Sequence, residues 1–141
     1  MDTATLVRFV EHNTLMVAVA SISGGMLLWP LLRQTAAGPS VSAQQATLLI
    51  NREDALVIDV RDPGEYGAGH VLGARNVPAA ELETNGDVAK RKDKPVIVYD
   101  DSGPRATRAV TALRKAGFEK VYSLSGGLAG WQQAGLPTEK A

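Results

Sequence analysis

The sequence predicts one α/β domain with a mostly parallel sheet, preceded by one membrane-spanning helix. Two patterns lead to this fold class. Short apolar runs alternate with amphipathic stretches from residue 41 onward, and an uncharged run stands before them. The 141 residues suffice for one compact domain and an accessory segment. We therefore divide the chain into a short tail (1–12), a transmembrane helix (13–32), a linker (33–40) and the domain (41–141).

Composition excludes several classes of function. Lys plus Arg number 15 and Asp plus Glu number 15, so no net charge indicates a nucleic-acid binder. The chain has no cysteine, which removes disulfides, zinc-thiolate sites, thiol nucleophiles and persulfide carriers. We expect no cofactor, no metal site and no nucleic-acid partner.

The uncharged run is NTLMVAVASISGGMLLWPLL, residues 13–32. At 1.5 Å per residue it would extend about 30 Å, the thickness of a bilayer hydrocarbon core. A buried core helix usually shows a polar face, and none appears here. A cleaved signal peptide is the other alternative, but the run is longer than its apolar region and acidic residues precede it. The sequence therefore favours a single-pass anchor in the lipid bilayer.

Basic residues around the span predict its orientation. Only Arg8 precedes the span, whereas Arg33 and Arg52 follow it. This excess favours a cytoplasmic C-terminal domain at the cell membrane, which for a bacterial chain is the inner membrane. Residues 33–40, RQTAAGPS, are small and polar and would hold the domain at the membrane surface.

Small residues lie four apart within the span. Ala20 pairs with Gly24, and Ser21 pairs with Gly25. This spacing lets transmembrane helices approach closely. A weak homodimer through the span is therefore one hypothesis, and mere dilution of a marginal span is the alternative.

The domain begins with a helix and continues as strands and helices in alternation. Three stretches show helical periodicity: SAQQATLLINRE (42–53) with Ser42 as N-cap, RATRAVTALRKAGF (105–118), and GLAGWQQAGLP (127–137). In the second helix we expect Val110, Leu113 and Ala116 to face the core and Gly117 to end it. Four stretches are predicted strands: ALVIDV (55–60), part of GARNVPAAEL (73–82), KPVIVYD (94–100) and EKVYSLSGG (119–127). Ligands of such sheets bind beyond the carboxyl ends of the strands, where Asp59 and Asp100 fall.

Several short motifs occur in a fixed order along these elements: Asp59-Val60-Arg61, Gly69-His70-Val71, Gly73-Ala74, Gly117-Phe118, and Gly126-Gly127 with Trp131. In this order and spacing they resemble a single-domain rhodanese-like protein over residues 41–137. The resemblance implies a five-stranded parallel sheet flanked by helices. It also implies transfer of sulfane sulfur through a cysteine persulfide as the usual activity.

The family's catalytic loop has six residues and corresponds here to Asp100-Asp101-Ser102-Gly103-Pro104-Arg105. The family cysteine falls on Asp100, the loop arginine is kept as Arg105, and Ala106 stands where a hydroxyl residue commonly follows. We expect the loop N–H groups and Arg105 to hold the Asp100 carboxylate, so that it fills an anion site. Asp101 and Ser102 are expected to add helix capping, and Pro104 suits a first helical turn. No catalytic residue is therefore assigned.

Aspartate chemistry in the same loop is the alternative. An aspartyl phosphatase needs a second acid two residues on, where Ser102 stands, and a receiver-like site needs a lysine that is not placed for it. A magnesium site would require Asp100 and Asp101 to point together. A sulfurtransferase that uses another group is a further alternative.

Three polar residues outside the loop are expected to support the fold: Asp59, Arg61 and His70. Trp131 is predicted to anchor the core and Trp29 to lie at the membrane interface. The leading hypothesis is a membrane-anchored rhodanese-like domain without sulfurtransferase activity that binds an unidentified protein partner at the membrane. A passive domain on an interacting anchor is the competing interpretation.

Overall fold

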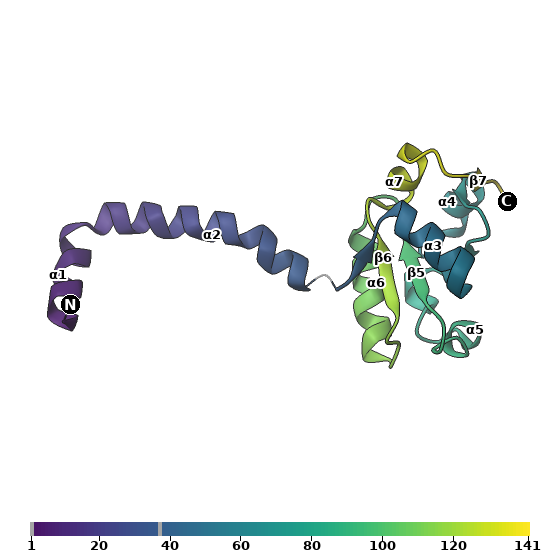
Figure 1. Cartoon of the computed structure of the whole chain (residues 1–141), viewed down its shortest axis with the longest axis horizontal. Helices are drawn as coiled ribbons and strands as arrows, with labels where there is room; N and C mark the ends of the chain where they lie inside the picture. Colours follow the sequence, from purple (N-terminus) through teal and green to yellow (C-terminus); the bar gives the residue numbers. More distant parts are fainter. Residues whose placement is uncertain (1, 37) are drawn as a thin grey trace. The chain divides into compact units, whose positions relative to one another are not determined.

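The computed structural model describes residues 2–36 and 38–141, with the side chains of residues 33–36 left out. The chain divides after Ala36 into a helical unit and a larger domain. The helical unit contains α1 (Thr3–His12) and α2 (Thr14–Ala36) (Figure 1). The predicted tail is therefore mostly helical, and the predicted linker is helical up to Ala36. Residue 37 and the side chain of Arg33 lie outside the described part.

Helix α2 contains the predicted span. Its segment Thr14–Leu32 has 19 residues, is apolar enough to cross a membrane, and has none of its length buried inside the protein. This length and composition are shared by membrane spans and by signal sequences near an N-terminus.

The domain contains seven short strands and six helical segments in its described residues. The strands are β1 (Ser40–Val41), β2 (Leu56–Asp59), β3 (His70–Val71), β4 (Arg75–Asn76), β5 (Val96–Tyr99), β6 (Val121–Leu124) and β7 (Thr138–Glu139). The helices are α3 (Ala43–Glu53), α4 (Pro63–Ala68), α5 (Gly86–Ala89), α6 (Pro104–Lys115) and α7 (Gly127–Gln133), with a 3-10 turn η1 (Ala79–Glu81).

Five strands form one sheet in the order β1-β6-β5-β2-β4, and every neighbouring pair is parallel. The predicted five-stranded parallel sheet flanked by helices is confirmed. Strands β3 and β7 form a separate antiparallel ribbon that the sequence did not predict.

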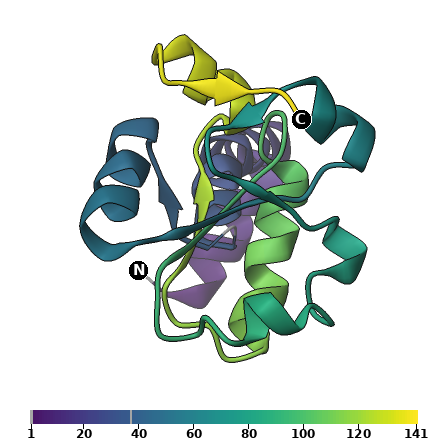
Figure 2. The same cartoon turned by 90° about the vertical axis from the view of Figure 1, so that its right-hand side faces the viewer.

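Helices cover both faces of the sheet (Figure 2). Side chains alternate along β2 and β5, so Ile58 and Val98 contribute to one core cluster while Val57 and Ile97 contribute to the other. The first cluster is shared with α6 and α5, and the second with α3 and α7. Burial on both faces explains why these strands are continuous apolar runs.

Local signals place the two long helices of the domain. Ser42 caps α3, since its Oγ accepts from the Gln45 N–H at 3.2 Å and the Gln45 side chain accepts from the Ser42 N–H at 2.9 Å. Helix α6 begins at Pro104 and buries Val110 and Leu113 as predicted. Ala116 was expected on the same face, but it is the C-cap residue and is exposed, because the helix has ended at Lys115.

Candidate functional site

Two aspartates lie at the carboxyl edge of the sheet. Asp59 ends β2 and pairs in register with Tyr99, so Asp100 follows directly at the end of the neighbouring strand β5. Asp59 is 0% exposed and Asp100 is 2% exposed. Buried carboxylates require hydrogen-bond partners, and the two residues find them in different ways.

Backbone N–H groups hold the Asp100 carboxylate. Its Oδ1 accepts from the Gly103 N–H at 2.5 Å, and its Oδ2 accepts from the Arg105 N–H at 2.9 Å. The loop thus turns its donors inward at the start of α6, and Gly103 supports the turn with a φ of +130°. The carboxylate occupies the position where a loop of this form would bind an anion.

Backbone hydrogen bonds from helix α7 hold the loop of residues 100–105 in place. The N–H of Leu128 donates to the carbonyl of Asp100 at 2.8 Å, and the N–H of Ala129 donates to that of Asp101 at 3.3 Å. A Cβ on Gly127 would lie 2.4 Å from the Asp100 carbonyl oxygen, a separation that real Cβ atoms essentially never show. The Gly126-Gly127 pair in the sequence was a signal for this close approach, but the partner segment could not be read from it.

Arg61 neutralises Asp59. Its Nε lies 3.0 and 3.1 Å from the two carboxylate oxygens, and its NH2 lies 2.7 Å from Oδ2. The same guanidinium donates to the Gly69 carbonyl at 2.6 Å. Burial by itself would lower the pKa of Arg61, but the bonds to Asp59 and then Asp101 raise it above its ordinary value. Asp59 and Arg61 thus join the end of β2 to the loops that follow it.

At the exposed side of the loop, Asp101 and Arg105 take part in a network of ion pairs. Asp101 accepts from Arg61 at 3.0 Å and from Arg105 at 3.2 Å. Arg105 also contacts Glu65 of α4 through two nitrogens at 3.2 and 3.4 Å, while its Nε is 3.8 Å from Asp100. The hydrogen bond to Arg105 lowers the pKa of Glu65, and the same bond raises the pKa of Arg105. The Arg105 guanidinium is therefore an ion partner of Asp100 as predicted, but its side-chain hydrogen bonds go to Glu65 and Asp101.

The predicted capping of α6 is distributed differently from the expectation. Pro104 is the first helical residue, and the N-cap residue is Gly103. The Asp100 carboxylate, rather than Asp101 or Ser102, accepts from the Arg105 N–H in the first turn. The Asp101 carboxylate turns toward two arginines instead, because these cations lie at the loop mouth.

His70 is 2% exposed and has a structural environment. Its Nδ1 lies 2.9 Å from the Tyr66 carbonyl oxygen, its Nε2 lies 3.1 Å from Glu139 Oε1, and its ring stacks on Tyr66. The Gly73 N–H and then His70 lower the pKa of Glu139. This arrangement attaches the C-terminal strand β7 to β3.

The two aspartates of the loop point to different partners. Asp100 is turned into the loop N–H groups and Asp101 toward Arg61 and Arg105, so the two carboxylates bind different partners. Within residues 2–36 and 38–141, no group of three or more His, Asp or Glu side chains could hold a metal ion. Both carboxylates are therefore engaged in hydrogen bonds within the protein.

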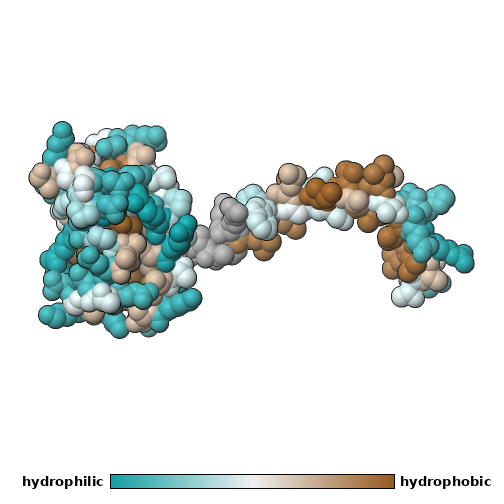
Figure 3. All heavy atoms as spheres, turned by 180° about the vertical axis from the view of Figure 1, so that it is seen from behind, coloured by the Kyte–Doolittle hydropathy of each residue, from teal (hydrophilic) through white to brown (hydrophobic). Residues whose placement is uncertain are grey.

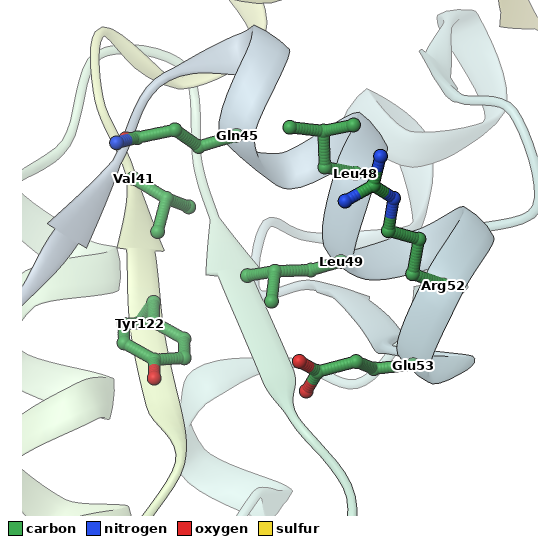
Figure 4. Close-up of a pocket in the computed structure, with 7 residues that line it drawn as sticks. All are labelled: Val41, Gln45, Leu48, Leu49, Arg52, Glu53 and Tyr122. Atoms are coloured by element: carbon green, nitrogen blue, oxygen red, sulfur yellow. The ribbon is translucent and has the colours of Figure 1, made fainter.

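A separate hollow of about 350 Å³ lies beside α3, away from the loop. Figure 4 shows its lining residues: Val41, Gln45, Leu48, Leu49, Arg52, Glu53 and Tyr122. Leu48 is 50% exposed there. No sequence motif indicated this hollow.

Comparison with known proteins agrees with the fold. The family model for the rhodanese-like domain matches residues 42–134. The chain belongs to the rhodanese-like domain family. The rhodanese-like domain of the Alr3790 protein from Anabaena sp. superimposes with a TM-score of 0.67 at 33% identity, covering 74% of this chain and 80% of that one.

Two curated relatives differ in how much of the chain they match. The uncharacterized protein YibN of Escherichia coli (strain K12) is 37% identical over 135 residues, which is 94% of each chain. That similarity therefore extends over most of the helical unit. The thiosulfate sulfurtransferase GlpE of Pseudoalteromonas translucida is 34% identical over 99 residues, covering 67% of this chain and 89% of the relative.

Proposed function

We propose that this rhodanese-like protein is anchored in the cell membrane, lacks sulfurtransferase activity, and binds a protein partner at the membrane surface. One observation supports the proposal most directly: the Asp100 carboxylate accepts hydrogen bonds from the loop N–H groups of Gly103 and Arg105. Sulfane sulfur is held by a nucleophilic thiolate, and the chain contains no thiol. Because the loop is filled by the chain's own carboxylate, the role that we propose for the domain is recognition of a protein surface.

An assay of sulfur transfer from thiosulfate to cyanide tests the missing activity. We expect the purified full chain to match a buffer control. We expect Asp100→Cys to take the outer sulfur of thiosulfate with release of sulfite, and to pass it to cyanide as thiocyanate. The thiol pKa in that variant should lie below about 8.5, because the N–H groups and Arg105 favour the thiolate.

Asp100→Ser is the matched control, since it offers a small nucleophile without sulfur and should remain inactive. Transfer should stay weak even in Asp100→Cys, because Asp101 adds a negative charge and Ala106 provides no hydroxyl. Robust transfer by the unmodified chain would overturn the proposed lack of activity.

The membrane part of the proposal rests on Thr14–Leu32 and on the similarity to YibN along most of the helical unit. Carbonate extraction is the test, and recovery of the chain in the soluble fraction contradicts an integral anchor. The proposed cytoplasmic side rests on Arg33 and Arg52. Digestion of the domain by protease in cells with only a permeabilised outer envelope contradicts that orientation.

Affinity capture tests the partner and separates it from the span. The full chain is compared with residues 41–141, which lie within one compact unit. Proteins enriched by both chains support binding by the domain. Enrichment by the full chain alone would instead favour an interacting anchor, including self-association through Gly24 and Gly25. Unchanged cross-linking in Gly24→Leu and Gly25→Leu removes that homodimer.

A further inference from the structure

Helix α1 has an apolar and a polar face. Its large apolar side chains follow helical spacing, and each is 44% to 60% exposed: Leu6, Val7, Phe9 and Val10. The polar side chains Arg8, Glu11 and His12 line a shallow hollow together. Figure 3 shows hydrophobic and hydrophilic side chains on different sides of this terminal helix. None of the residues of Thr3–His12 is buried.

A break at Asn13 separates α1 from α2. Asn13 has a φ of −121° and a ψ of 30°, and both its N–H and its side-chain amide donate to the Phe9 carbonyl, at 3.0 and 2.9 Å. The Thr14 hydroxyl donates to the Glu11 carbonyl at 2.9 Å. These bonds satisfy the last carbonyls of α1 and end it as a separate helix. Helix α2 then begins without a polar face of charged residues.

The two helices have different environments by length and charge. Thr14–Leu32 alone has 19 residues, or about 28 Å of helix, which matches the hydrocarbon core without any help from α1. Arg8 and Glu11 make α1 unsuitable for the hydrocarbon core. Its four large apolar side chains are equally unsuited to water. A position in the membrane–water interface satisfies both faces.

We propose that α1 lies flat in the membrane–water interface, with lipid covering Leu6, Phe9 and Val10, on the side of the membrane opposite the domain. The proposal rests on the proposed anchoring by α2 and goes beyond it. Lipid is the partner that we assign to the apolar face of α1, because only Asn13 separates α1 from the membrane-spanning helix. Asp2 and Glu11 outweigh Arg8. Burial of apolar area, rather than attraction to anionic headgroups, therefore supplies the affinity.

The absence of cysteine from the sequence makes the test clean. Two matched pairs of single-cysteine variants of the full chain carry an environment-sensitive fluorophore: Leu6→Cys with Arg8→Cys, and Phe9→Cys with Glu11→Cys. Residues two apart lie about 200° apart around a helix and about 3 Å apart along it, so each pair probes opposite faces at nearly the same position along the helix axis. The proteins are reconstituted in vesicles of phosphatidylcholine alone, with a phosphatidylcholine spin-labelled near its headgroup as quencher.

We expect the Leu6 and Phe9 positions to be quenched by the spin-labelled lipid roughly threefold more than their partners. The Arg8 and Glu11 positions should instead be quenched more by aqueous iodide. Equal behaviour within both pairs would overturn the proposal. So would a difference that disappears on dilution with lipid, since a second copy would then cover the face. Protection of the Leu6 and Phe9 positions from both quenchers would also overturn it, because the face would then pack against protein.

Carbonate extraction of the same vesicles separates this inference from the anchor. If the chain is extracted, the anchoring fails. If the chain is retained while the paired positions behave alike, anchoring stands and the interfacial position of α1 fails.

Discussion

Asp59 and Asp100 lie at the same sheet edge and are both buried, yet they are stabilised differently. Asp59 pairs with a cationic side chain, since the Arg61 guanidinium supplies three close nitrogen–oxygen contacts in addition to the Arg61 backbone N–H, which donates at 2.9 Å. Asp100 depends on backbone, since its hydrogen bonds come from the N–H groups of Gly103 and Arg105. Truncation of the Arg61 side chain therefore removes the cation that pairs with Asp59, whereas no side-chain truncation removes the two N–H groups that bind Asp100.

Removal of the guanidinium should have the largest effect. We expect Arg61→Met to lower the free energy of unfolding by about 3 to 5 kcal/mol, because the buried Asp59 carboxylate then loses its cationic partner and keeps the N–H of residue 61 as a neutral donor. Denaturant unfolding of the full chain, followed by the domain's circular dichroism, gives the value. Arg61→Lys is the control, since it keeps the charge but loses the two-pronged geometry, and it should fall between the variant and wild type. A loss below about 1 kcal/mol would show that Asp59 does not depend on Arg61.

The contact between Gly127 of α7 and the Asp100 carbonyl should be the next most sensitive to substitution. We expect Gly127→Ala to cost about 2 to 4 kcal/mol, because a Cβ would collide with the Asp100 carbonyl at a φ of +58°. Gly135→Ala is the matched control: its φ is +73°, but a Cβ there meets nothing within 4 Å. Equal losses of unfolding free energy in the two variants would mean that backbone strain, rather than contact with the loop, accounts for the effect.

Neutralising Asp100 should cost less than removing Arg61. We expect Asp100→Asn to lower the free energy of unfolding by about 1 to 2 kcal/mol, because one oxygen still accepts while the new NH₂ group faces a backbone donor. Urea titration at neutral pH measures the change, with Asp101→Asn as a control at the exposed end of the loop. A loss as large as that of Arg61→Met would mean that the loop depends on the charge itself.

Local patterns predicted much of this edge, whereas contacts between distant segments did not emerge from the sequence. Apolar runs marked β2 and β5, and the resemblance placed Asp100 at the start of a loop that closes on Arg105. Glu65 was missed because its role exists only after α4 packs beside the loop, 40 residues away in the chain. The β3–β7 ribbon was missed for the same reason: two-residue strands carry almost no periodic signal, and their pairing joins residues 70 and 139.

The exposed ion pair between Glu65 and Arg105 should have the smallest effect on stability. Glu65 and Arg105 are both 39% exposed at their side chains, so solvent screens their attraction. The Arg105 contact lowers the pKa of Glu65, so the pair stabilises the folded state above the ordinary carboxyl pKa of 4.5. That contribution is lost as the pH falls through the lowered value.

Glu65→Gln should therefore reduce the melting temperature slightly near neutral pH, and the difference from wild type should vanish in acid. Thermal unfolding between about pH 7 and pH 3 measures this convergence. Glu119→Gln, an exposed substitution between α6 and β6, controls for general loss of negative charge. A Glu65→Gln difference that persists in acid would show that the side chain acts by packing. In that case the charges of the Glu65–Arg105 pair, unlike those of the Asp59–Arg61 pair, would make no measurable contribution to stability.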